Sequence, residues 1–366
     1  MACATPWTPK LTAPDSLPHI GELPAGARDA ISDVAGVTVG HHALAAGAVQ
    51  TGVTVVKAHQ GDLFLDRVPA AAVVLNGFGK SVGLVQVREL GVLETPIALT
   101  NTFSVAAVAT AQIRHCIASN PQTGRSLPTV NPLVFECNDG YLNDIQQMAI
   151  SEDHYRQALA SASVDFEQGA VGAGRGMSSF GLKGGIGSAS RLVRLGAGTP
   201  YTVGALVLSN FGKLEQLTLA GQPLGRQLLA GRVRAQVQAQ EPDKGSIILL
   251  VATDAPLDAR QLHRLALRAG VGLARAGSVF GHGSGDIALA FSTAYTVPQQ
   301  TSRPMPNLAM LHDALLDPLF QAAADSTEQS IIHALWRATA VTGRDGHRRQ
   351  ALAELLTDAT MPIHLP

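Results

Sequence analysis

The sequence predicts an α/β domain in which sheets and helices pack in layers, and two observations carry this prediction. Segments with strand character alternate with segments of helical period along the whole chain. Several of the predicted strands are apolar on both faces, which is typical of strands that are covered on both sides. No Pro/Ser-rich linker, internal repeat or shift in composition divides the 366 residues. We therefore expect residues 1–366 to form a single domain.

Six short apolar segments are predicted to be strands. They are residues 53–59, 70–75, 132–137, 201–208, 247–252 and 287–291.

The first predicted helix begins at Ser104, which is a suitable N-cap residue. A helix from this point places one set of mostly apolar side chains on one side: Val105, Val108, Gln112, Ile113, Cys116 and Ile117. Further helices are predicted at residues 143–160, 258–276, 307–323 and 327–342. The apolar stripe of the helix at 258–276 consists of Leu262, Leu265, Ala269 and Leu273.

The composition argues against two classes of partner. Only 15% of the residues are charged and the formal net charge is −1, so neither a nucleic acid nor a membrane surface is an expected partner.

The three cysteines, Cys3, Cys116 and Cys137, are scattered and form no CxxC pair, which favours a reducing compartment. The first thirty residues lack an apolar segment behind a basic start, and no later window has about 18 uninterrupted apolar residues. We expect a soluble, cytoplasmic protein.

Several glycine-containing motifs do not meet the requirements of the sites they resemble. Residues 79–81 end like a P-loop, but Val74 stands where the first glycine is required. Residues 172–176 lack the spacing of a dinucleotide-binding loop. Ser284, between two glycines, precedes a strand, whereas the nucleophile elbow of a hydrolase leads from a strand into a helix. We expect no nucleotide cofactor, although Ser284 remains available to assist another nucleophile.

Two adjacent histidines, His41 and His42, are the most obvious candidates for metal ligands. On a strand their side chains point to opposite faces, so they cannot chelate one metal ion. We expect no metal site.

The most informative local feature is the junction between Gly245 and Ser246, where the polar segment 236–244 meets the predicted strand at 247–252. A serine here could attack the carbonyl before it, cut the chain and become an N-terminal nucleophile. Glycine allows strained backbone angles at the scissile peptide. The released α-amino group, with an ordinary pKa of about 7.7–8.0, could act as a base near neutral pH. On local pattern alone, an ordinary boundary between a loop and a strand is the stronger interpretation.

A resemblance that covers nearly the whole chain after about residue 20 reverses this preference. Residues 245–257, GSIILLVATDAPL, are similar to the segment at the self-cleavage site of the DmpA/BapA family. This family comprises the L-aminopeptidase/D-esterases and β-peptidyl aminopeptidases of peptidase family S58. Other blocks resemble the family in the same order: residues 29–41, 75–80, 93–102, 136–144, 183–187, 209–212, 283–287 and 343–347.

The resemblance implies that Ser246 is the nucleophile for both self-cleavage and substrate hydrolysis. Ser284 and Asp286 match the serine and the acidic residue that form hydrogen bonds toward this nucleophile. As alternate residues at the start of a strand they can point to the same side. The alternative for this pair is a turn with a capping carboxylate.

Two further positions match functional residues of the family. Asn210 matches the asparagine whose amide stabilises the tetrahedral oxyanion, a role worth about 3 kcal/mol; an asparagine in the turn after a strand is the alternative. Glu136 matches the carboxylate that holds the free amino terminus of the substrate. Since an unpaired carboxylate at the end of an apolar strand is costly, the alternative is an ion pair with an internal Arg or Lys.

The fold implied is the family's αββα four-layer sandwich, which resembles the Ntn hydrolases in architecture but differs in connectivity. The resemblance also implies one catalytic domain cut between Gly245 and Ser246 into residues 1–245 and 246–366. The family commonly forms tetramers of such αβ pairs.

The leading function is a self-processing serine aminopeptidase that acts on small peptides, amides or esters with a free amino group. An acyltransferase of the ornithine acetyltransferase type is one alternative, although those enzymes use threonine as the nucleophile. A non-catalytic binding protein on the same scaffold is the other. Whether L-, D- or β-amino acyl groups are preferred stays open.

Overall fold

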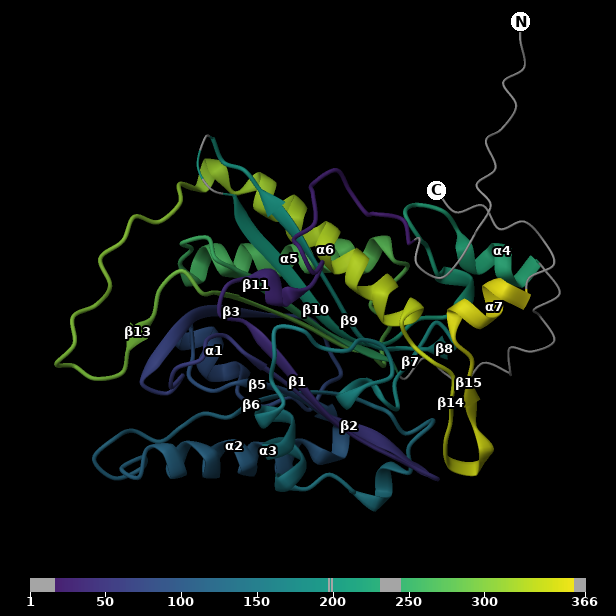
Figure 1. Cartoon of the computed structure of the whole chain (residues 1–366), viewed down its shortest axis with the longest axis horizontal. Coiled ribbons are helices and arrows are strands. Elements are labelled where there is room, and N and C mark those ends of the chain that lie inside the picture. The colour runs from purple at the N-terminus through teal and green to yellow at the C-terminus, as the bar shows by residue number, and fades with distance from the viewer. Residues whose placement is uncertain (1–16, 197, 199, 231–244, 359–366) are drawn as a thin grey trace, which may run out of the picture.

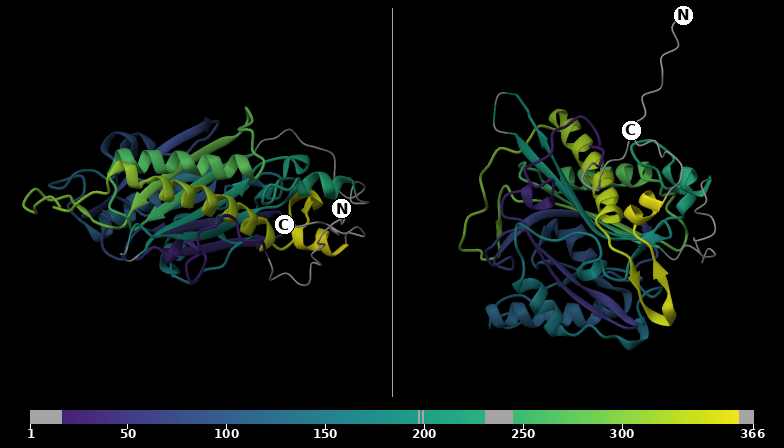
Figure 2. Two further views of the ribbon diagram at one scale, coloured as in Figure 1. Left: turned by 90° about the horizontal axis from the view of Figure 1, so that it is seen from above. Right: turned by 45° about the vertical axis from the view of Figure 1, so that its right-hand side comes forward.

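A computed structural model describes residues 17–196, 198, 200–230 and 245–358, which form four layers in the order helix, sheet, sheet, helix (Figure 1). Helices α5 (Ala259–Arg275) and α6 (Asp317–Trp336) lie side by side on the larger sheet (Figure 2). Helices α2 (Val105–Ser119) and α3 (Glu152–Ala160) cover the outer face of the smaller sheet. The predicted layered α/β fold is confirmed.

The larger sheet has seven strands in the order β13-β3-β12-β11-β10-β9, with β4 beside β3. β11 and β12 are parallel and are joined by α5, as the crossover between parallel neighbours requires, whereas the other pairs are antiparallel. The strands are β3 (Asp66–Gly77), β4 (Val92–Leu93), β9 (Gly185–Val193), β10 (Tyr201–Asn210), β11 (Ser246–Thr253), β12 (Gly285–Ser292) and β13 (Val297–Pro298).

The smaller sheet has four strands in the order β1-β2-β5-β6. β5 and β6 are parallel and are joined by α2, and the other two pairs are antiparallel. The strands are β1 (Thr38–Ala46), β2 (Val49–Lys57), β5 (Ile97–Asn101) and β6 (Leu133–Cys137).

Alternating side chains of β11 explain why its sequence is apolar throughout. Ile247, Leu249 and Val251 pack in the core beneath α5 and α6, whereas Ile248 and Leu250 pack in the core between the two sheets. A third core lies between the smaller sheet and helices α2 and α3. Every residue of β11 is buried, so its two apolar faces reflect two covered faces.

The remaining elements are short and lie at the edges of the layers. The helices are α1 (Leu84–Leu90), α4 (Leu224–Ala230) and α7 (Leu352–Asp358), and the strands are β7 (Ser178–Ser179), β8 (Leu182–Lys183), β14 (Val341–Thr342) and β15 (Arg348–Arg349). The 3₁₀ turns are η1 (Ile31–Asp33), η2 (Thr102–Ser104), η3 (Ile145–Gln147), η4 (Gly172–Gly174), η5 (Leu214–Gln216), η7 (Asp313–Leu315) and η8 (Arg344–Gly346).

Three of the predicted helices were wrong in extent. The helix expected at 143–160 begins only at Glu152, because Met148 adopts a left-handed backbone, with φ of 46°, that ends the preceding 3₁₀ turn. The two helices expected at 307–323 and 327–342 are a single helix, α6.

The sequence analysis places a break between residues 323 and 327, where α6 carries polar side chains, but the helix is continuous there. Thr327 donates its hydroxyl proton to the Ala323 carbonyl within the helix, and Ser326 donates to the Val203 carbonyl of the sheet below. Because these hydroxyls bond to carbonyls, they do not compete for the helix N–H groups and the helix continues.

The start of α2 also differs from the prediction in its capping residue. The side chain of Asn101 accepts hydrogen bonds from the backbone N–H groups of Phe103 and Ser104, so Asn101 takes the capping role expected of Ser104. Ile117, placed on the buried side by its spacing, is 44% exposed.

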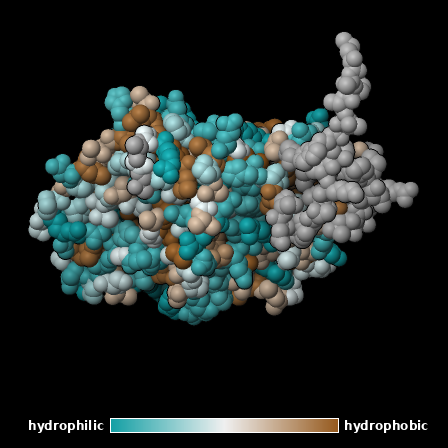
Figure 3. All heavy atoms as spheres, turned by 45° about the horizontal axis from the view of Figure 1, so that its top comes forward, coloured by the Kyte–Doolittle hydropathy of each residue, from teal (hydrophilic) through white to brown (hydrophobic). Residues whose placement is uncertain are grey.

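None of the helices in the described part of the chain is long and apolar enough to cross a membrane. Figure 3 shows hydrophilic side chains over most of one face, with hydrophobic ones in scattered groups between them.

The sequence did not predict β9, because its residues 185–190 are glycine, serine, alanine and a single isoleucine. These small residues allow α6 to lie close to the sheet. A Cβ atom on Gly187 would stand 1.8 Å from the Ser330 carbonyl oxygen and 2.6 Å from the Ala334 nitrogen.

We therefore expect Gly187→Ala to destabilise the fold by about 1–3 kcal/mol, since α6 must move away from β9 to admit the methyl group. Thermal or denaturant unfolding measures this effect. Gly198→Ala is the matched control, because a Cβ atom there would have nothing within 4 Å. Equal stability of the two variants would show that α6 is not held against Gly187.

Candidate active site

Three strand ends of the larger sheet meet at one point. β10 ends at Asn210, β11 begins at Ser246 and β12 begins at Gly285. The register pairs Ser246 with Asn210 on one side and with Gly285 on the other. Strand pairing therefore places three of the blocks singled out in the sequence next to one another, although they are far apart along the chain.

The hydroxyl of Ser246 lies against the carbonyl group that precedes it. Its Oγ atom donates a hydrogen bond to the Gly245 carbonyl oxygen, at 2.8 Å, and accepts one from the Gly285 N–H, at 3.2 Å. The backbone amide of the neighbouring strand thus holds the hydroxyl oxygen beside the peptide bond that it would attack. The polar segment 236–244 that precedes this junction in the sequence lies outside the described residues.

Ser284 and Asp286 point to the same side at the start of β12. The Ser284 hydroxyl donates to Asp286 Oδ1 at 2.5 Å, and both residues are buried. Since a hydroxyl has one hydrogen and two lone pairs, this bond leaves the Ser284 oxygen able to accept a proton. Ser284 also directly precedes the Gly285 amide that contacts Ser246, so the pair lies next to the candidate nucleophile.

The side chain of Asn210 bridges strand β7 and the segment that follows β6. Its Oδ1 atom accepts a hydrogen bond from the Ser178 N–H at 2.8 Å, and its Nδ2 atom donates to the Asn138 carbonyl at 3.0 Å. These partners lie outside the turn that follows its own strand, so the side chain does not act as a local turn cap. The two bonds fix the amide with its nitrogen toward residue 138.

Lys183 has a positioning role that sequence reasoning missed. Its side chain is fully buried, and Nζ donates to the carbonyl oxygens of Gly174, Met177 and Gly184 at 2.6–2.9 Å. Burial lowers the pKa of Lys183, but three carbonyl acceptors match the three N–H donors of an ammonium group, and we assign that form. The bonds hold the segment leading to Ser178, which orients Asn210. A lysine among small and apolar residues was the available signal.

Glu136 is a buried carboxylate whose donors among the described residues are neutral. Oε1 accepts a hydrogen bond from the Lys80 backbone N–H at 2.8 Å, and Oε2 accepts a short one from the Thr102 hydroxyl. Glu136 is only 2% exposed. No ion pair within the described ranges involves Glu136, so the internal Arg or Lys expected by the alternative interpretation is not its partner.

Gly79 lies close to both the Glu136 carboxylate and the start of β12 at Gly285. A Cβ atom at this position would lie 3.8 Å from Glu136 Oε1 and 3.8 Å from the Gly285 Cα atom. The neighbouring Phe78 N–H donates to the Ser284 carbonyl at 3.2 Å. Residues 79–81 only partly match a P-loop, and the backbone of residues 78–80 instead binds both halves of the candidate site, through the Phe78 N–H to Ser284 and the Lys80 N–H to Glu136.

The two adjacent histidines lie on β1 and have separate surroundings. His41 contacts the Thr54 hydroxyl and the Glu167 carbonyl, at 2.9 and 3.1 Å, and burial lowers its pKa to about 4. His42 stacks on His154 with ring centroids 5.0 Å apart. Within the described part of the chain, no group of three or more His, Cys, Asp or Glu residues has the arrangement of a metal site.

Comparison with known proteins shows similarity along most of the chain. The model of Peptidase family S58 matches residues 29–349. The chain is 38% identical over 347 residues to the beta-peptidyl aminopeptidase BapA of Sphingosinicella microcystinivorans, a match that spans 89% of this chain and 86% of that protein.

Two solved structures are similar in fold and in sequence. A beta-aminopeptidase of Burkholderia sp. has a TM-score of 0.84 and 40% identity, covering 93% of this chain and 95% of the other. The L-aminopeptidase D-Ala-esterase/amidase of Ochrobactrum anthropi has a TM-score of 0.84 and 35% identity, with the same coverage. The latter is described as a prototype for the serine aminopeptidases and as a variant of the Ntn hydrolase fold. The expected DmpA-type αββα architecture is confirmed.

Asp139 follows Asn138, whose carbonyl accepts the hydrogen bond from the Asn210 amide, and its carboxyl group has a raised pKa. Asp139 is fully buried, and this burial raises its pKa to about 7, against the effect of a hydrogen bond from Asn143 to Oδ1. Between about pH 4 and pH 7 the folded chain keeps this proton and the unfolded chain loses it. Since the folded state binds more protons in this range, stability falls as the pH rises through it.

Asp139→Asn replaces the protonated acid with a neutral amide of the same shape. We expect the variant to resemble the wild type in stability near pH 4.5 and to exceed it by about 2–4 kcal/mol at pH 8, where the wild type carries the buried charge. Unfolding midpoints measured from pH 4.5 to pH 8 test this. A difference between the two proteins that does not change with pH would contradict it.

Proposed function

The chain belongs to peptidase family S58 and is a serine-type hydrolase of the aminopeptidase class, and we propose that it matures by cutting itself between Gly245 and Ser246. The observation that carries the proposal is the hydrogen bond of 2.8 Å between Ser246 Oγ and the Gly245 carbonyl oxygen. It supports a nucleophile already placed at the scissile peptide, on a residue that is buried.

Maturation proceeds by an N-to-O acyl shift. Ser246 Oγ bonds to the Gly245 carbonyl carbon, the peptide C–N bond breaks, and the hydroxyl proton passes to the leaving nitrogen. Water then hydrolyses the ester, which restores the hydroxyl and leaves Gly245 as a carboxylate. The products are residues 1–245 and 246–366 of one catalytic domain, and Ser246 gains a free α-amino group.

Substrate hydrolysis uses the same groups. The carbonyl of the substrate takes the place of the Gly245 carbonyl, and the α-amino group of Ser246 acts as the base. Ser284, whose hydrogen is held by Asp286, accepts and returns the proton through its free lone pairs. An amide nitrogen has two hydrogens, so Asn210 can donate one to the Asn138 carbonyl and the other to the oxyanion.

Glu136 makes the enzyme an aminopeptidase rather than a general amidase. Its carboxylate is buried and receives two neutral donors, and an uncompensated buried charge costs several kcal/mol. A substrate ammonium group supplies the missing opposite charge. The substrates are therefore small peptides, amides or esters with a free amino group, and we further propose a cytoplasmic enzyme that assembles as a tetramer of αβ pairs.

The maturation step predicts that Ser246→Ala stays a single inactive chain, because no hydroxyl remains to attack Gly245. Denaturing gel electrophoresis and N-terminal sequencing of the smaller fragment test this. Ser292→Ala is the matched control, since Ser292 is a buried serine of the neighbouring strand whose hydroxyl bonds to the Ala255 carbonyl. Cleavage in Ser246→Ala, or a small fragment that starts elsewhere, would sink the proposal.

The ammonium site predicts that N-acetylation of a good substrate abolishes cleavage, and that Glu136→Gln loses at least about a hundredfold in kcat/KM for free-amine substrates. Glu94→Gln is the matched control. Glu94 is also buried, and its carboxylate also accepts two neutral donors, the backbone and side-chain N–H groups of Asn131. Equal kcat/KM of the wild type for free and acetylated substrates would reduce Glu136 to a structural carboxylate.

A further inference from the structure

Asn76 lies near the end of β3, beside the turn that leads into β12. Val74 pairs with Ile287 on β12, and Asn76 pairs with Asp286. β3 therefore has one extra residue at this point, Leu75, which forms a β-bulge. A bulge changes the direction of nearby side chains and is common next to active sites. It accounts for an asparagine side chain that reaches across to the neighbouring turn.

The side-chain amide of Asn76 holds both ends of this turn. Its Nδ2 atom lies 2.6 Å from the Gly281 carbonyl oxygen and 2.6 Å from the Ser284 carbonyl oxygen. An amide nitrogen has two hydrogens, so it can donate one to each oxygen. The Ser284 N–H donates to the Gly281 carbonyl at 2.9 Å and closes the turn. Both donors of Asn76 are thus used on the turn that carries Ser284.

The Ser284 carbonyl belongs to the peptide unit that contacts the candidate nucleophile. The other end of this unit is the Gly285 N–H, which donates to Ser246 Oγ at 3.2 Å. In a planar trans peptide the C=O and the N–H point in opposite directions. Fixing the carbonyl oxygen on one side therefore fixes the direction of the N–H on the other. Asn76 Nδ2 and the Phe78 N–H, at 3.2 Å, both bind that oxygen.

Gly285 is the reason that this peptide unit has to be held by hydrogen bonds. A Cβ atom at Gly285 would stand 2.8 Å from the Phe78 carbonyl oxygen, so β3 and β12 are too close here for any other residue. A glycine can adopt a wider range of backbone angles than other residues. The bonds to the Ser284 carbonyl restrict that freedom at the N–H that faces Ser246.

We propose that Asn76 is a positioning residue for Ser246, acting through the peptide unit between Ser284 and Gly285. The inference rests on the proposed function and adds to it a residue on a third strand. Negative charge develops on Ser246 Oγ as its proton is removed, and a fixed N–H donor stabilises that charge. Hydrogen bonds to the carbonyl also polarise the same peptide unit, which strengthens its N–H as a donor. Asn76 therefore assists both self-cleavage and substrate hydrolysis.

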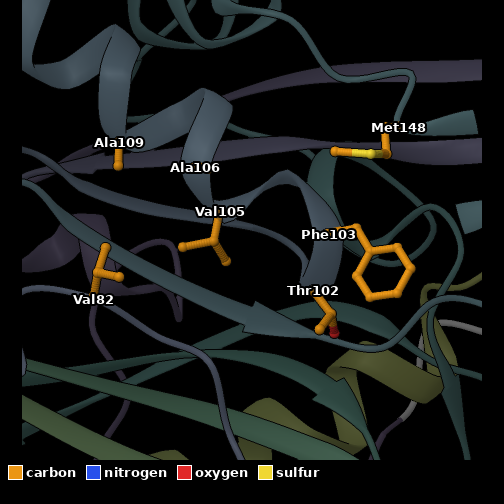
Figure 4. A pocket seen from close by; sticks show the side chains of 7 residues that line it. All are labelled: Val82, Thr102, Phe103, Val105, Ala106, Ala109 and Met148. Atoms are coloured by element: carbon orange, nitrogen blue, oxygen red, sulfur yellow. The ribbon is translucent and has the colours of Figure 1, made fainter. Parts of the chain in front are cut away.

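The Glu136 carboxylate, which binds the substrate ammonium in our proposal, is held by other groups. Oε1 accepts from the Lys80 backbone N–H, and Oε2 accepts from the Thr102 hydroxyl. Figure 4 shows Thr102 together with the apolar side chains that line a pocket beside the smaller sheet. Loss of the Asn76 amide leaves these two bonds in place. The inference therefore predicts a change in kcat without a change in KM.

Asn76→Asp tests the inference, because it keeps the shape of the side chain and replaces both N–H donors with an oxygen that repels the two carbonyls. Asn76 is half-buried, so the new charge is not placed in a core. We expect self-cleavage, and kcat of the matured enzyme on an amino acyl p-nitroanilide, to slow at least about tenfold, since a misplacement of about 1 Å can cost about a hundredfold. KM should change less than about twofold. Asn76→Ala, which removes the amide without adding charge, should give the same result.

Gln112→Ala is the matched control. The Gln112 side-chain amide also donates to two backbone carbonyls, those of Pro96 and Leu133 at 2.7 and 3.2 Å, but it lies on α2. This variant should have a lower unfolding midpoint, with kcat and the rate of self-cleavage within about twofold of the wild type. An Asn76 variant that unfolds at no lower temperature than Gln112→Ala, yet cuts itself slowly or not at all, supports the inference without any measurement of kcat.

The outcomes separate this inference from the proposed function. A wild-type protein that neither cuts itself nor hydrolyses amino acyl p-nitroanilides contradicts the proposed function, and this inference with it. A fully active wild type with Asn76 variants of equal activity overturns only the inference. If kcat and KM both change in the Asn76 variants, the amide supports residues 76–80 as a whole, including the Lys80 N–H at Glu136, and the specific role at Ser246 is wrong.

Discussion

The register of β10, β11 and β12 is the constraint on which the rest of the site depends. β11 is held between α5 and α6 on one face and the smaller sheet on the other, and apolar side chains fill both cores. Because side chains alternate, a slip of one residue would send each of them into the opposite core. The register that satisfies both cores is the one that pairs Ser246 with Asn210 and with Gly285. Packing energy spread over the sheet thus fixes the position of one hydroxyl group.

Lys183 and Glu136 are two buried charged groups that differ in how many of their possible hydrogen bonds are made. This difference distinguishes a structural role from a binding role. The Lys183 ammonium has three donors and meets three carbonyl oxygens, so it is complete within the chain. Glu136 can accept about four hydrogen bonds, yet the described residues give it two, both from neutral groups. Lys183 is therefore a closed structural link that supports Asn210 through Ser178, whereas Glu136 retains capacity for a cation from outside the chain.

The sequence predicted the layered fold and the central strands of the larger sheet, since their apolar faces record burial directly, but it did not predict β5 of the smaller sheet. It failed where small or polar residues are buried. β9 was missed because Gly185, Gly187 and its serines carry no apolar signal, and α6 was divided because hydroxyls at 326 and 327 resemble a helix start. The candidate site residues were identified by resemblance to a known family and not from the hydrophobic periodicity of the sequence. Lys80 and Lys183 lie in blocks that resemble the family, but their roles were not predicted, because Lys80 acts through its backbone N–H and Lys183 through bonds to carbonyl oxygens.

Gly79 joins the two chemical halves of the site and limits the substrate that can span them. A Cβ atom there would stand 3.5 Å from Ile287 Cδ1 and 3.8 Å from both the Glu136 carboxylate oxygen and the Gly285 Cα atom, which belongs to the residue whose N–H contacts the Ser246 hydroxyl. An amino acyl group must reach from Glu136 to Ser246 with one carbon between its nitrogen and carbonyl if it is an α-amino acid, and with two if it is a β-amino acid. Glycine adds no side chain beside Ile287 here, so in our proposal either length can lie across this position. In our proposal, the nucleophile and the carboxylate fix the two ends of the substrate, and the missing side chain leaves the length between them adjustable.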